Sequence, residues 1–91
     1  MTKDKLKETL GVYRNYFEEQ QTGKKKIPAD KNPQSNIEAL EYMHAMLDEM
    51  EEFLKEGRIE KFHRWLGFLQ GNLWRMGIFT LEELKNHNRP L

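Results

Sequence analysis

Residues 62–91 read FHRWLGFLQGNLWRMGIFTLEELKNHNRPL, and this stretch decides the fold more than any other. It holds both tryptophans, three of the five phenylalanines and three of the six glycines of the chain. A helix of a small domain usually buries one apolar stripe about 100° wide. The apolar and small residues here are too many for one stripe, so we expect this helix to meet more than one neighbour.

Helical spacing places seven apolar residues on one stripe, which we expect to face the core. They are Ile59, Phe62, Trp65, Leu66, Leu69, Leu73 and Met76. Gly77 follows and is typical of a helix end in the left-handed conformation, a Schellman motif. Thr80 and Glu83 have the spacing of a capping box, which indicates the start of another helix. We therefore predict a helix over 58–76 and a short one over 80–88.

Upstream of this stretch, the apolar spacing predicts helices over 1–21 and 35–56. A basic loop over 22–34, with two prolines, joins them. Ser35 and Glu38 have capping-box spacing at the start of the second helix.

Together these elements predict an all-α fold, in which the chain forms a single helical domain over 1–91. We expect a small antiparallel bundle of three longer helices plus a short C-terminal helix, with the second and third helices forming a hairpin. A chain of 91 residues buries only a small core, so we also expect a homo-oligomer.

The composition excludes several classes of protein. The chain has 15 basic and 15 acidic residues, so a globally basic nucleic-acid binder is disfavoured and sequence-specific DNA binding is not expected. No cysteine is present, which excludes disulfides and thiol chemistry. Residues 36–57 carry a net charge of −6, and the flanking segments carry +3 each. An acidic helix between basic segments indicates charge pairing, within a subunit or between subunits.

The start of the chain, MTKDKLKETL, is charged from the third residue, unlike a signal peptide. No apolar run approaches the roughly 20 residues that cross a membrane. We expect a soluble protein with no membrane partner.

Small residues gather on a second face of the helix over 58–76, which we interpret as an oligomer or partner interface. A glycine inside a helix costs about 1 kcal/mol relative to alanine, so two of them one turn apart need a compensating contact. That contact is close packing of another helix, from the same chain or a symmetry mate, or a ligand beside the tryptophan. The interface residues are His63, Gly67, Gln70, Gly71 and Trp74.

A third face of the same helix carries Arg64, Phe68 and Arg75. The two guanidinium groups span about 16 Å of the helix axis, with an aromatic ring between them. Arginine binds phosphate or carboxylate through two parallel hydrogen bonds, and phenylalanine offers a stacking surface. The alternative is that the arginines pair with the acidic helix and that Phe68 packs at a subunit contact. The full ligand-binding prediction consists of Arg64, Phe68, Arg75, Trp74, Lys25 and Arg89.

No catalytic residue, metal ligand or cofactor is predicted. Glu41/His44 and Glu60/His63 have the Glu-x-x-His spacing of di-iron helical bundles. In a hairpin that turns near Gly57, however, the two pairs lie about 20 Å out of register. Only a metal site shared between subunits stays open.

The C-terminal third resembles a family of small bacteriophage and prophage helical proteins. The residues that carry the resemblance lie within 62–90 and read RWLGFLQG, LW, GIFT, ELK and NRP. The resemblance implies a phage accessory protein that acts in the host cytoplasm. Small phage proteins of this kind often neutralise host defence by binding, either sequestering a signalling nucleotide or blocking a defence protein; that is analogy, not chemistry.

Three functions follow, in order of preference. The first is a non-enzymatic, oligomeric binding protein that antagonises a host antiviral defence system, sequestering a nucleotide immune signal in pockets between subunits. The alternative is a protein–protein interaction module or inhibitor that docks on a host protein. A magnesium-dependent all-α nucleotide hydrolase comes a distant third.

Overall fold

A computed structural model describes residues 2–89 of the chain; Met1, Pro90 and Leu91 lie outside the described residues. The described residues form α1 (Lys3–Glu19), α2 (Asn36–Lys55), α3 (Ile59–Arg75) and α4 (Leu81–Asn88). No strand occurs among them, so the predicted all-α class is confirmed. The helix bounds differ from the expected ranges by at most two residues. Within 2–89, no helix combines the length and the apolar character needed to cross a membrane.

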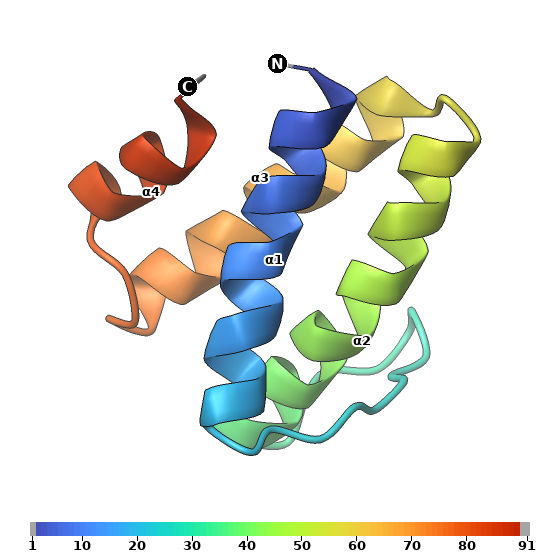
Figure 1. Cartoon of the computed structure of the whole chain (residues 1–91). Helices are drawn as coiled ribbons and strands as arrows, with labels where there is room; N and C mark the ends of the chain where they lie inside the picture. The colour runs from blue at the N-terminus through green and yellow to red at the C-terminus, as the bar shows by residue number, and fades with distance from the viewer. Residues whose placement is uncertain (1, 90–91) are drawn as a thin grey trace.

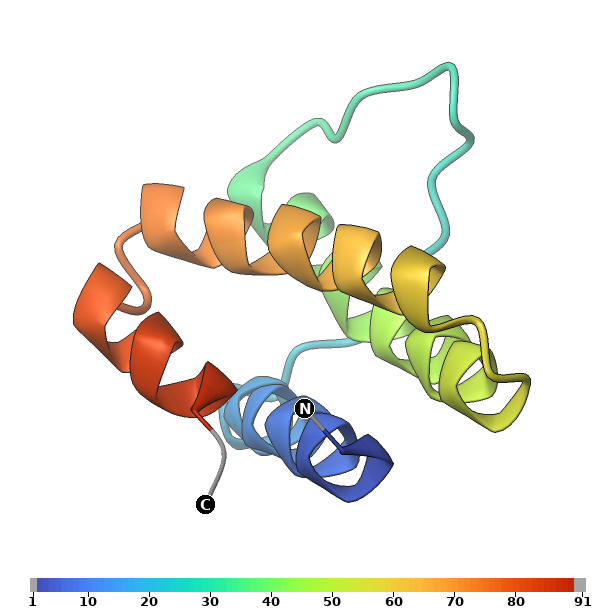
Figure 2. The same cartoon turned by 90° about the horizontal axis from the view of Figure 1, so that it is seen from above.

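The four helices enclose one core. Helices α1 and α2 lie side by side and run in opposite directions, joined by the long loop over 20–35 (Figure 1). Helix α3 follows α2 after a short turn and crosses the α1/α2 pair (Figure 2). Helix α4 turns back from the end of α3 and contacts α1. The outward side of α3 therefore lies between the long loop and α4 (Figure 2).

Helices α1, α2 and α4 start at side-chain caps, whereas no side chain caps α3. The capping box of Thr80 and Glu83 is complete: the Glu83 amide donates to the Thr80 hydroxyl at 3.1 Å, and the Thr80 amide donates to the Glu83 carboxylate at 3.0 Å. The box at Ser35 is only half formed. The Glu38 amide donates to the Ser35 hydroxyl at 3.1 Å, but the Glu38 carboxylate accepts from the Gln34 amide.

Helices α1, α2 and α3 are each followed by a residue in the left-handed conformation. Gly77 has φ 74°, and the Ile78 amide donates to the Leu73 carbonyl at 3.0 Å, which confirms the Schellman motif. Gly57 ends α2 with the same φ. Helix α1 ends the same way at Gln21, with φ 56°, although a side chain makes this conformation costly.

The core contains residues from all four helices, and α4 contributes one buried residue, Leu84. Four members of the expected α3 stripe are buried: Phe62, Leu66, Leu69 and Leu73. The other three, Ile59, Trp65 and Met76, are half-buried against the core. Burying one such side chain contributes about 1.5–3 kcal/mol to the free energy of unfolding, so this stripe holds α3 in place.

Candidate functional site

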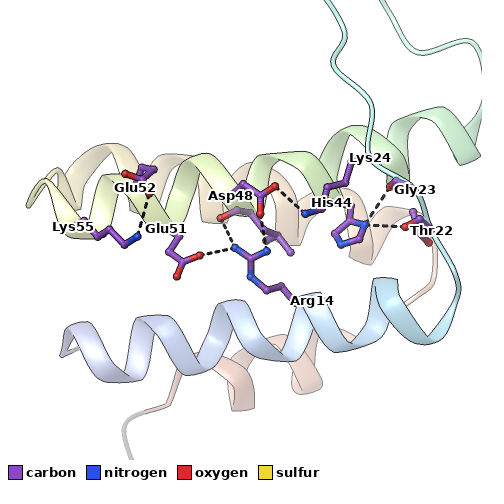
Figure 3. Close-up of polar contacts among 10 residues, drawn as sticks. Arg14, Thr22, Gly23, Lys24, His44, Asp48, Glu51, Glu52 and Lys55 are labelled. Carbon is purple, nitrogen blue, oxygen red and sulfur yellow. Dashed lines mark hydrogen bonds and ion pairs between the residues drawn. The ribbon is translucent and has the colours of Figure 1, made fainter.

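The acidic side of α2 is paired with basic residues of the same chain. Arg14 of α1 donates to Asp48 at 2.7 Å and to Glu51 at 2.9 Å, and Lys24 donates to Asp48 at 2.9 Å (Figure 3). Partial burial raises the pKa of Asp48, but the hydrogen bonds from Arg14 and Lys24 outweigh it and hold that pKa below its usual value. The expected charge pairing of the acidic helix therefore occurs within one chain.

The loop lysines take part in the same pairing. Lys25 contacts Glu38 at 3.1 Å and Lys26 contacts Glu49 at 2.6 Å. Each pair is solvated and contributes little by itself. Together with Lys24 they fasten the first part of the loop along α2. The amine of Lys25, which we predicted to bind a ligand, already has an acidic partner in Glu38.

His44 fastens the loop from the inside. Its Nδ1 lies 2.9 Å from the Thr22 carbonyl and 3.1 Å from the Gly23 carbonyl (Figure 3). Both carbonyls only accept, so Nδ1 carries the proton and donates it. The ring also stacks on Phe17, with 5.1 Å between centroids. His44 is thus a loop anchor. Across residues 2–89, no three histidine, aspartate or glutamate side chains stand where they could hold a metal ion together.

Two hollows adjoin each other around Tyr42 and Phe68, whose side chains line both. The loop hollow, of about 380 Å³, lies between α2, α3 and loop residues 27–33. The arginine hollow, of about 390 Å³, is completed by Met46, Arg64 and Trp65. We call the two together the aromatic groove. Each hollow is within the range of roughly 300–1,000 Å³ typical of small-molecule sites.

Arg64 and Phe68 therefore lie together, as the sequence predicts, while Arg75 lines neither hollow of the aromatic groove. Phe68 is 57% exposed, so its ring is available to a ligand. The expected alternative, ion pairs from these arginines to the acidic helix, is wrong. Within the described chain, neither Arg64 nor Arg75 forms an ion pair, whereas Arg14 and the loop lysines pair with Glu38, Asp48, Glu49 and Glu51. The guanidinium of Arg64 keeps its full capacity for an anion.

Trp74 belongs to a different place. It is 54% exposed and lines a hollow of about 230 Å³ between α3 and α4. The lining residues are Gln70, Gly71, Trp74, Leu81, Leu84, Lys85 and Asn88. Trp74 and Phe68 thus line different hollows, and the structure does not bring them into one site. Arg89, the last residue described, is exposed at the end of α4.

The two interior glycines of α3 face open space. Gly67 and Gly71 are exposed, and a Cβ atom added at either would have no neighbour within 4 Å. The expectation that another helix of the same chain packs against them is wrong. His63, expected beside them, is also exposed. The chain itself therefore gives no packing reason for glycine at these two positions.

Gln70, expected at the interface, is instead buried inside the chain. Its Nε2 donates to the Tyr13 hydroxyl and to Asn88 Oδ1, both at 2.8 Å, and its Oε1 accepts from Asn88 Nδ2 at 3.1 Å. The Tyr13 oxygen accepts from Gln70 and keeps its own proton, which it can donate to His87 Nδ1 at 3.0 Å when that nitrogen is unprotonated. We call Tyr13, Gln70, His87 and Asn88 the polar network. It ties α1, α3 and α4 together.

The polar network shifts two pKa values. Burial raises the pKa of Tyr13 to about 12, although the hydrogen bond from Gln70 opposes this. Burial lowers the pKa of His87, partly offset by Glu83. Both shifts favour the neutral forms that the hydrogen bonds require.

Sequence reasoning missed Tyr42 and the polar network. The sequence gives little indication of Tyr42, which is one aromatic residue beside the apolar stripe of α2. The sequence gives a stronger indication of the network. Tyr13 and Gln70 each place a polar group on a packed helix, and such a group needs a hydrogen-bond partner when it is buried. The chain matches no protein-family model, no curated protein and no solved structure.

Proposed function

We propose that the chain is a non-enzymatic binding protein whose aromatic groove binds a nucleotide. The observation that supports this best is the position of Arg64, an arginine without an acidic partner among residues 2–89, beside the rings of Tyr42 and Phe68. Such a groove can contact three parts of a nucleotide together: the anionic phosphate, the flat base and the apolar edge of the sugar.

Each part of the groove has a matching chemistry. The planar guanidinium of Arg64 suits a phosphate, which accepts two parallel hydrogen bonds. The 57% exposed ring of Phe68 suits stacking of a base, which contributes about 1–3 kcal/mol per base. Residues 22–26 of the loop are already held on α2 before any ligand arrives, so this part of the loop needs no further ordering on binding.

The biological setting follows from the phage resemblance of residues 62–90. We propose an accessory protein that antagonises host antiviral defence in the bacterial cytoplasm by sequestering a nucleotide signal. Self-association through the exposed side of α3 would place two aromatic grooves near each other and enclose the ligand more fully. Arg75 and Arg89, which lie outside the groove of one chain, would then be available to a ligand held between subunits.

A second function is favoured by the Trp74 hollow. Trp74 and Leu81 are 54% and 57% exposed, next to the open Gly71. Exposed aromatic and aliphatic side chains beside a flat backbone are common at protein interfaces. In this alternative the chain is an interaction module or inhibitor that docks on a host protein through α3 and α4, and the aromatic groove plays no part.

Titration calorimetry against a panel of mononucleotides, cyclic oligonucleotides and ADP-ribose derivatives separates these functions. We expect one nucleotide class to bind without turnover, and Arg64→Ala to weaken its binding by roughly tenfold or more. Arg58→Ala is the control, an exposed arginine at the start of α3 that lines neither hollow of the groove. No binding by any nucleotide, or equal loss in both variants, would contradict the groove. Product formation with magnesium would contradict the non-enzymatic assignment.

A further inference from the structure

We infer that the loop hollow of the aromatic groove selects adenine through the side-chain amide of Asn72. This inference rests on the proposed function and specifies which base the groove reads. Asn72 lies one turn after Phe68 on α3, is half-buried, and lines the loop hollow together with Tyr42 and Phe68. It is therefore a polar group that stands beside both aromatic rings.

The orientation of the Asn72 amide is fixed by its own helix. Nδ2 donates to the Phe68 carbonyl at 2.9 Å. A carbonyl oxygen only accepts, so the amide nitrogen has to face it and the amide cannot be turned over. Oδ1 makes no hydrogen bond to any described residue, and the second N–H of Nδ2 is likewise unused. Asn72 thus presents one acceptor and one donor side by side.

The surroundings make this pair selective. Most other walls of the loop hollow are apolar, among them Ile27, Pro28 and Met43. A polar group that enters such a site loses hydrogen bonds to water and needs a partner there. The ion pairs of Lys24, Lys25 and Lys26 and the hydrogen bonds of His44 hold residues 22–26, the segment that leads into the loop wall, on α2. The start of the wall is thereby fixed relative to α2.

Adenine fits this arrangement. Its amino group donates, and the ring nitrogen beside it accepts, which is the pattern that an asparagine amide reads with two hydrogen bonds. Guanine presents a carbonyl oxygen where adenine has its amino group, and that oxygen would face the Asn72 acceptor. With the base between Tyr42 and Phe68, the phosphate extends toward Arg64 in the arginine hollow. The proposed ligand is therefore an adenine nucleotide.

The test compares AMP with purine riboside 5′-monophosphate, which differs only by lacking the amino group. Calorimetry on the full chain should show AMP binding roughly 5- to 50-fold more tightly, as expected for one bidentate contact. Asn72→Leu should bring both ligands to the same affinity, with helix content by circular dichroism unchanged. Arg64→Ala should weaken both ligands and keep their ratio.

The two hypotheses fail in different ways. Equal affinities for the two ligands in the unmodified chain would overturn the adenine inference and leave the nucleotide groove standing. A preference for AMP that survives Asn72→Leu would also overturn it, because the selectivity would come from elsewhere. Binding of neither ligand, nor of any other nucleotide, would overturn the proposed function itself.

Discussion

The two sides of α3 differ in how their polar groups are used. On the inner side, every hydrogen-bonding group of the Gln70 amide has a partner in Tyr13 or Asn88. On the outer side, Arg64 and Asn72 retain unused donors and an unused acceptor beside the exposed ring of Phe68. Both sides carry polar residues at helical spacing, so composition alone does not distinguish them.

The difference separates architecture from binding. Among residues 2–89, no buried side-chain nitrogen or oxygen atom lacks a hydrogen-bond partner. A satisfied buried network rigidifies a small domain, because an unpaired group there is costly. Unused capacity next to an exposed ring makes no contribution to the fold of the single chain. Substitutions on the inner side should therefore change stability, and substitutions on the outer side should change binding.

The largest expected effect is at Tyr13, whose side chain is fully buried. Tyr13→Ala should lower the free energy of unfolding by about 3–5 kcal/mol, as for other buried aromatic residues. Tyr13→Phe keeps the ring and removes only the hydroxyl, and should cost about 1–3 kcal/mol because Gln70 and His87 lose that partner. Urea denaturation measures both. A Tyr13→Phe variant as unstable as Tyr13→Ala would mean that the ring contributes little and would break the comparison.

A smaller effect, of the opposite kind, is expected at Phe68. Phe68→Ala should weaken nucleotide binding by about 1–3 kcal/mol through lost stacking. The free energy of unfolding should change by no more than about 0.5 kcal/mol, because the ring is mostly exposed. Calorimetry and urea denaturation on the same preparation give both values. If Phe68→Ala destabilised the chain as much as Tyr13→Ala, Phe68 would be a residue that stabilises the fold, which would contradict the comparison.

Gly67→Ala and Gly71→Ala sharpen the comparison further. In the single chain an added Cβ touches nothing within 4 Å, so each change should stabilise α3 by about 1 kcal/mol. If a second copy packs on this side of α3, the same changes should instead lower the melting temperature in a concentration-dependent way. Melting curves at several concentrations, with light scattering for the mass, distinguish the two. Stabilisation at every concentration would contradict self-association through these glycines.

The smallest expected effect is the pH dependence contributed by His87. Its pKa is lowered in the folded chain from an ordinary value of 6.5, so below that pH the unfolded chain binds the proton more readily. Above pH 6.5 the His87 proton should not lower the free energy of unfolding. That free energy should fall as the pH drops below 6.5 and become constant again below the pKa of His87 in the folded chain. Glu83 and Lys5, which face His87, act in opposite directions on this pKa.

Urea denaturation between pH 7.5 and pH 5 measures this slope, and His87→Gln is the control. Glutamine keeps an acceptor for the Tyr13 hydroxyl but does not titrate. The slope should shrink in that variant. An identical slope in both chains would assign the pH dependence to other groups.

Local signals in the sequence predict much of the fold. Three features depend only on residues a few positions apart: the turn at Gly77, the capping box of Thr80 and Glu83, and most of the α3 stripe. The types of those residues are enough to predict them. The ion pairs of the loop lysines could not be predicted in this way, because the sequence of a charged run is the same whether its side chains are solvated or paired. Their partners lie on α2, 13 to 24 positions away, and only the folded chain brings them together.

The site was predictable only in part. Arg64 and Phe68 share a helix, so their spacing places them together. Tyr42 belongs to α2 and the loop wall to residues 27–33. The periodicity of α3 does not indicate that they lie beside Arg64 and Phe68. Gln70 was assigned to the wrong side because its stripe looked polar until α4 supplied Asn88 as a partner. Arg75 and Trp74 lie on α3 as well, but the packing of the loop and of α4 directs them to other surroundings.

The most direct test of the two-sided helix is a ¹⁵N NMR titration of the full chain with AMP. We expect amide shifts to change at Tyr42, Arg64, Phe68 and Asn72, and at the loop over 27–33. The amides of Tyr13, Gln70, His87 and Asn88 should keep their positions. Shifts confined to Trp74 and α4, or an unchanged spectrum at saturating AMP, would contradict the aromatic groove as the binding site.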